Sequence, residues 1–194
     1  MAKLSKEYKA VAELASLLYD TVLENLQNSG RPVMARNIEL DDSFFSDDPA
    51  QKTNPEIKKY LGKFSLNNRV FDLWLCSEIN WYAPGKIYAG LKISDAEDQE
   101  IIFSEELKNQ LKNFFGELIS SGQEPVDGWI CWRYITINGD TTTNTGSGAI
   151  PHFKVPNDAL VQLNNNEKIF TRFATVLLNT WNDYNQKALE LIKK

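Results

Sequence analysis

A near-alternation of apolar and polar side chains between residues 70 and 82 constrains the fold more than any other feature of the sequence. Successive side chains of a strand point to opposite faces of its sheet, so a period of two predicts a strand with one buried face. The apolar positions are Phe71, Leu73, Leu75, Ile79 and Trp81, and the opposite positions are Asp72, Trp74, Cys76, Glu78, Asn80 and Tyr82. The chain therefore needs a sheet whose apolar side is covered by other elements.

Neighbouring segments supply further strands. Residues 60–66 precede an Asn67-Asn68 pair, and asparagine tolerates the left-handed backbone of a tight turn, so a hairpin is predicted there. Pro84-Gly85 turns the chain again into residues 86–94. Residues 33–40 are predicted to form a further short strand, and residues 128–138 have the β-branched and aromatic composition of another.

Three segments carry the three-to-four spacing of amphipathic helices. The first covers residues 4–26, and the last runs from about residue 166 to 193. The middle helix begins at Ser104, where Glu105 and Glu106 complement the helix dipole, and it is predicted to end at Gly122.

This order predicts an α+β fold: an antiparallel meander of three to five strands flanked by an N-terminal, a middle and a long C-terminal helix. A length of 194 residues suits a single domain spanning residues 1–194. The polar composition of residues 41–56 and 138–152 predicts two flexible loops within that domain.

The charge of the chain bears on its partners. A net charge of −5 and scattered lysines and arginines argue against duplex nucleic acid, which needs a concentrated basic surface.

No apolar stretch approaches the length of a membrane span, and the first residues lack the apolar core of a signal peptide. Cys76 and Cys131 lie in separate apolar runs, so we expect reduced thiols, a cytoplasmic location and no cofactor.

The polar side of residues 70–82 holds the best candidate for chemistry. With a tight Pro84-Gly85 hairpin, Glu78 is expected beside Gly90 and diagonally from Lys92. Asp72, Glu78 and Lys92 would then share a face with Trp74 and Tyr88, and two carboxylates with a lysine can hold a divalent metal and activate water. The alternative is a purely structural ion pair between Glu78 and Lys92.

Residues 60–138 resemble the core of the PD-(D/E)XK nucleases in their run of strands, helix and strand. The resemblance implies that Asp72 is the metal-binding acid and Lys92 the lysine of the motif. The sequence departs from the motif at two positions, because Gly90 stands where the second acid belongs and Phe71 where the proline belongs. Glu78 would have to replace the missing ligand.

An acidic segment brackets two aromatic residues. Its members are Asp41, Asp42, Phe44, Phe45, Asp47 and Asp48. Their spacing does not fit a calcium-binding EF-hand loop. It suits docking into a basic, apolar groove of another protein, and the alternative is that both rings fold back onto the sheet.

A second polar segment, residues 138–152, is long for a connection in a compact domain and could form a lid over a small ligand. Gly146, Ser147 and Gly148 could form a small anion nest, and His152 is the only histidine. One histidine excludes a zinc site with two or three imidazoles from this chain.

The sequence therefore favours a non-enzymatic protein-interaction protein, in its most concrete form an acidic inhibitor or immunity-type protein that masks a basic surface of its partner. Two alternatives stay open: a variant metal-dependent nuclease domain that uses Asp72, Glu78 and Lys92, and a small-ligand-binding domain closed by residues 138–152.

Overall fold

The described part of the chain is a set of helices and strands in an α+β arrangement. The computed structural model describes residues 2–26, 32–36, 54–79, 87–95, 97, 99, 101–120, 123–126, 128–135, 141–142 and 165–193. Its helices are α1 (Ala2–Leu26), α3 (Glu105–Phe115) and α5 (Glu167–Ile192). Its strands are β1 (Val33–Arg36), β2 (Glu56–Leu66), β3 (Arg69–Ile79), β4 (Ile87–Ser94), β5 (Trp129–Ile135) and β6 (Thr141–Thr142).

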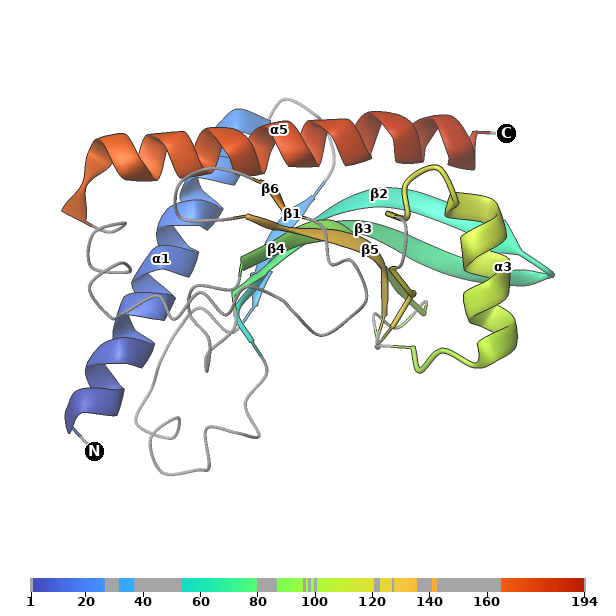
Figure 1. The fold of residues 1–194 in the computed structure, drawn as a ribbon, viewed down its shortest axis with the longest axis horizontal. Coiled ribbons are helices and arrows are strands. Elements are labelled where there is room, and N and C mark those ends of the chain that lie inside the picture. The colour runs from blue at the N-terminus through green and yellow to red at the C-terminus, as the bar shows by residue number, and fades with distance from the viewer. Residues whose placement is uncertain are drawn as a thin grey trace.

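The strands form one sheet in chain order, β1-β2-β3-β4-β5-β6, and each neighbouring pair is antiparallel. The predicted meander with its three flanking helices is confirmed (Figure 1). Some details differ from the prediction. Thr141 and Thr142 pair with β5 inside the segment expected to be a loop, and α3 ends at Phe115, after which Leu118 turns back to bond the Phe115 carbonyl.

The β2–β3 hairpin closes through Asn67 and Asn68, whose φ angles of 48° and 64° are the left-handed values that a two-residue type I′ turn requires. Further along, the register shifts between Tyr60 and Gly62, so that β2 carries one extra residue. This bulge keeps Ile57 and Phe64, on either side of it, buried on the same face of the sheet.

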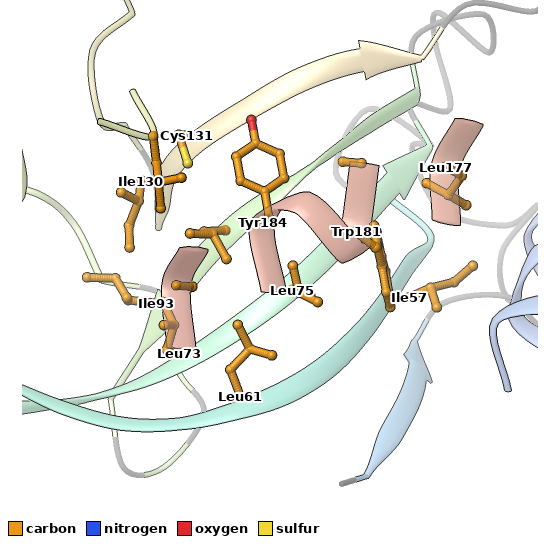
Figure 2. Packing of buried hydrophobic residues seen from close by; sticks show 14 of the residues in the cluster. Ile57, Leu61, Leu73, Leu75, Ile93, Ile130, Cys131, Leu177, Trp181 and Tyr184 are labelled. Carbon is orange, nitrogen blue, oxygen red and sulfur yellow. The ribbon is translucent and has the colours of Figure 1, made fainter. Parts of the chain in front are cut away.

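The helices cover one face of the sheet. Figure 1 shows α5 lying along that face, and Figure 2 shows Leu177, Trp181 and Tyr184 of α5 among buried side chains of the strands. Leu73, Leu75 and Ile79 of β3 belong to the same core, as the alternation predicted. None of the described helices combines the length and hydropathy needed to cross a membrane.

One polar contact crosses this core. The indole N–H of Trp181 donates to the hydroxyl of Ser77, at 2.7 Å, and both residues are about 1% exposed. Ser77 occupies an inward position of β3 where the sequence breaks its apolar run. A buried N–H needs a partner, so this serine fixes how Trp181 sits on the sheet.

A side chain closes the outer edge of β5. The amide of Gln123, 4% exposed, donates to the Trp132 carbonyl at 2.9 Å and accepts from the Trp132 N–H at 3.3 Å. It thereby occupies the place of a neighbouring strand beyond the two residues that pair with β6. Exposed edges of sheets invite pairing with other chains, and this amide blocks one of them.

We expect Ser77→Ala to lower the free energy of unfolding by about 1–3 kcal/mol, because it leaves the buried Trp181 N–H without an acceptor. Urea unfolding followed by tryptophan fluorescence measures the change. Ser65→Ala, at an exposed serine of β2, is the matched control and should change stability by less than about 0.5 kcal/mol. Equal effects of the two substitutions would contradict a role for the Trp181–Ser77 bond.

Candidate functional site

The second face of the sheet carries polar and aromatic side chains, and we call it the polar face. Cross-strand registers place its members side by side: Glu56 opposite Glu78, Tyr60 opposite Trp74, and Trp74 opposite Lys92. Its members are Glu56, Lys58, Tyr60, Asp72, Trp74, Cys76, Glu78, Tyr88, Lys92 and Trp129. The core helices α1, α3 and α5 pack on the other side.

A lysine flanked by two carboxylates lies at the centre of this face. Lys92 Nζ is 3.0 Å from Glu56 Oε1 and 3.7 Å from Glu78 Oε2, and the three side chains are only 12–17% exposed. Asn54 donates to the other oxygen of Glu78 at 2.6 Å. Glu56 and Glu78 are direct cross-strand neighbours that would repel each other, so the ammonium between them makes the arrangement stable.

The pKa values follow from this geometry. Burial opposes the charged form of Glu56, but the Lys92 ammonium and the bonds that Lys92 and Cys76 donate outweigh it, so the pKa of Glu56 is lowered from 4.5. Burial likewise opposes the charge of Lys92, but the negative charges of its neighbours, Glu56 and Glu78 among them, raise its pKa above the ordinary 10.5. At neutral pH, Lys92 is therefore a cation held between two anions.

Cys76 lies beneath this cluster and is fully buried. Its thiol donates to Glu56 Oε1 at 3.0 Å. Burial, followed by the nearby Glu56 carboxylate, raises the pKa of Cys76 well above 9.0. A thiol in this state is a hydrogen-bond donor and a poor nucleophile.

Aromatic rings complete the polar face. Lys58 Nζ lies 4.2 Å from the centre of the Trp74 ring, and Lys92 Nζ lies 5.2 Å from that of Trp129. Trp74 also packs edge-on against Tyr60 at 5.0 Å and donates its indole N–H to Ser94 at 2.9 Å. These contacts hold both lysines against ring faces, where a cation is stabilised.

The structure brings together part of the predicted constellation. Glu78 does reach Lys92, but it pairs with Tyr88 and not with Gly90, because the β3–β4 register is displaced by two residues from the expected one. Asp72 is opposite Ser94 and accepts a hydrogen bond from Tyr60 at 3.0 Å. Among the described contacts, Asp72 therefore belongs with Tyr60, and the lysine belongs with Glu56 and Glu78.

Sequence reasoning missed Glu56 and Asn54, because both fell in a segment assigned to a loop. A signal for Glu56 was present: Glu56, Lys58 and Tyr60 alternate with apolar Ile57 and continue the period of the following strand. No comparable pattern marks Asn54. Its role follows only from the fold, which places it beside Glu78.

The backbone excludes a side chain at Gly90, the position where the nuclease motif has its second acid. A Cβ atom built on Gly90 would lie 2.1 Å from the Cys131 carbonyl oxygen and 2.6 Å from the Trp132 Cα. Strand β5 thus occupies the space that a side chain at position 90 would need. Restoring the motif by substitution would require the two strands to move apart.

The remaining predictions concern a metal site and the two polar segments. No three His, Cys, Asp or Glu side chains of the described ranges gather in a way that could hold a metal ion. The acidic segment with Asp41, Asp42, Phe44, Phe45, Asp47 and Asp48 lies outside the described residues, as do Gly146, Ser147, Gly148 and His152.

A smaller polar cluster joins α5 to β5 on the helical face. Arg133 Nη1 is 3.5 Å from Asp183 Oδ2, and Lys187 is 2.9 Å from the other oxygen of Asp183. Burial raises the pKa of the nearby Cys131 to about 12, so this thiol too stays protonated. The cluster anchors the helix to the sheet, and it offers no activated nucleophile.

No protein-family model, curated protein or solved structure matches the chain. The chemistry of its own residues has to carry any functional conclusion.

We expect Lys92→Met to lower the free energy of unfolding by about 3 kcal/mol, because it removes the ammonium that lies between the adjacent carboxylates of Glu56 and Glu78 in a mostly buried site. The control is Lys108→Met, which removes a surface pair with the 84%-exposed Glu105 and should leave the free energy of unfolding nearly unchanged. Adding Glu56→Gln and Glu78→Gln to Lys92→Met should restore part of the loss. A triple variant no more stable than Lys92→Met would contradict the proposed balance of charges.

The lowered pKa of Glu56 predicts how the stability of the folded protein depends on pH. Because its pKa is lowered on folding, its contribution to stability is present above the unfolded value of 4.5 and is lost as the pH falls through the folded value. Denaturant unfolding measured below pH 5 should therefore show a steeper loss of stability for the wild type than for Glu56→Gln. Parallel curves for the two proteins would contradict the lowered pKa.

Proposed function

We propose that the protein acts by binding another protein and not by catalysis, as an acidic inhibitor or immunity-type protein that masks a basic surface. The observation that carries the proposal is the state of Lys92. Glu56 and Glu78 hold Lys92 in its protonated form. The charges of these three side chains therefore neutralise one another within the polar face.

The chemistry of the polar face supports this proposal. A general base has to accept a proton near neutral pH, and a lysine with a raised pKa is already protonated. A cysteine nucleophile has to ionise, and the pKa values of Cys76 and Cys131 are both raised. The side chains whose type would suit catalysis, a lysine and two cysteines, are thus held in protonated forms that stabilise the sheet.

The proposed interface is the acidic segment, which places four aspartates within eight residues of a chain whose net charge is −5. These carboxylates would steer a basic partner into encounter, since like and unlike surface charges act over about one Debye length. Phe44 and Phe45 would then bury their rings in an apolar groove of the partner. Both cysteines are free thiols in the structure, which suits the reducing cytoplasm that we propose as the location.

One observation favours a second candidate, the variant metal-dependent nuclease. Glu78 lies against Lys92, which is where an acid that replaces the ligand missing at Gly90 would have to lie. Under this alternative, a divalent metal would displace the ammonium from between Glu56 and Glu78. Asp72, six residues from Glu78 along β3 and bonded to Tyr60, lies too far along the strand to bind the same ion.

Partner capture separates the two candidates. The wild-type protein and two variants are immobilised and exposed to host lysate: one variant has Asp41, Asp42, Asp47 and Asp48 replaced by asparagine, and the other has Phe44 and Phe45 replaced by alanine. We expect a basic partner that the wild type retains and both variants lose. The asparagine variant should associate more slowly and with a flatter salt dependence, whereas the alanine variant should dissociate faster.

A plasmid-cleavage assay with Mg²⁺ or Mn²⁺ runs beside the capture. We expect no cleavage from the wild type or from either variant. Metal-dependent cleavage that Glu78→Gln abolishes, in a variant that still folds, would overturn the proposal in favour of the nuclease. Retention of the same basic partner by both segment variants would show that the interface lies elsewhere.

A further inference from the structure

The outer edge of β2 is paired along only part of its length. Strand β1 pairs with residues Glu56–Lys59, and the backbone of Pro32 accepts from Tyr60 N–H at 3.1 Å. Beyond Tyr60, β2 continues for six residues to Leu66 with β3 on its inner side. No strand of the described chain pairs with the outer side of this stretch.

The hairpin geometry tells which backbone groups point outward. In a hairpin with a two-residue turn, the flanking residues Leu66 and Arg69 form a hydrogen-bonded pair. Such pairs alternate along the ladder, so the N–H and C=O groups of Ser65 and Lys63 point away from β3. Both residues are exposed and no described strand pairs with these four groups, so they form an open edge in the described part of the sheet.

We propose that this edge pairs with the same edge of a second copy of the chain, so that two sheets join into one. An antiparallel pairing of two identical strands with its two-fold axis at Phe64 places Lys63 opposite Ser65 of the second copy, and Ser65 opposite its Lys63. Each of these two pairs exchanges two backbone hydrogen bonds. The same register therefore satisfies all four open groups of each copy.

The side chains also fit this register. Phe64 lies opposite Phe64 of the second copy on the helical face, where it already packs against Phe114 at 5.6 Å and Phe115 at 5.3 Å. Leu66 lies opposite Gly62, which has no side chain to obstruct it. Lys63 lies opposite serine and not opposite the other lysine, so like charges are not directly opposed.

The proposed interface is small, so we expect the association of the two copies to be weak. It consists of four backbone hydrogen bonds with little apolar burial, because Phe64 is only 4% exposed in the single chain, and this places it among the weak interfaces that form at high concentration. The exposed lysine keeps the edge soluble when it is unpaired. A concentration-dependent dimer is the expected behaviour.

Sedimentation equilibrium of the full chain, taken up to about 1 mM where weak association becomes visible, tests the proposal. The apparent mass of the wild type should rise from 22.1 kDa toward twice that value. Ser65→Pro removes one outward N–H and should hold the mass at one chain. Val70→Pro is the matched control, because Val70 lies opposite Ser65 in the same hairpin and its outward N–H points to the β4 side.

Amide hydrogen exchange gives a second measurement that needs no variant. Exchange at the Lys63 and Ser65 amides of the wild type should slow as concentration rises, while exchange at Val70 should not change. A wild type that stays at one chain mass overturns the proposal, and so does a Ser65→Pro variant that folds and dimerises like Val70→Pro. If Ser65→Pro does not fold, unchanged exchange at Lys63 and Ser65 overturns it.

Discussion

The burial of α5 on the sheet is the interaction on which the other elements depend. Phe173, Leu177, Trp181, Tyr184 and Ala188 recur at spacings of three and four along this helix, and all are at most 1% exposed. Without the helix, the apolar face of β2, β3 and β4 would be in water, at a cost of roughly 25 cal/mol for each Å² of apolar surface. Trp181 makes the contact directional as well as apolar, because its N–H reaches a single serine in the middle of the sheet.

Periodicity predicted the parts of the fold that depend on burial alone. The alternation of Phe71, Leu73 and Leu75 identified the inward face of β3, and Ser104 marked the beginning of α3, where its hydroxyl accepts from the Leu107 N–H. The register between β3 and β4 was predicted wrongly by two residues, because it is set by the length of the connection and not by the alternation. Either register leaves the same side chains inside. Asn54 and Gln123 could not be found in the same way, since each acts through a neighbour that only the fold brings close.

The polar face shows how charged residues can belong to the framework of a protein. Glu56 on β2, Glu78 on β3 and Lys92 on β4 tie three adjacent strands together, and Cys76 donates to the same carboxylate from below. A set of acids and a lysine on a sheet is the composition of a metal-dependent active site, and here it forms closed ion pairs. Composition at a site is therefore a weaker guide to activity than the direction in which each pKa is displaced.

The bulge in β2 has a consequence for how the hairpin can change length. With one extra residue at Leu61 and Gly62, the two halves of β2 present Ile57 and Phe64 to the same core. Deletion of one of these two residues would leave Ile57 and Phe64 six positions apart, and a regular strand also presents residues at that spacing on one face, so the hairpin would lose its bulge and keep Phe64 in the core. Closer to the turn there is no extra residue to lose, and a single deletion would turn the side chains on one side of it toward the opposite face. Between the bulge and the turn, insertions and deletions should thus be tolerated only in pairs within a strand, or in matching numbers on β2 and β3.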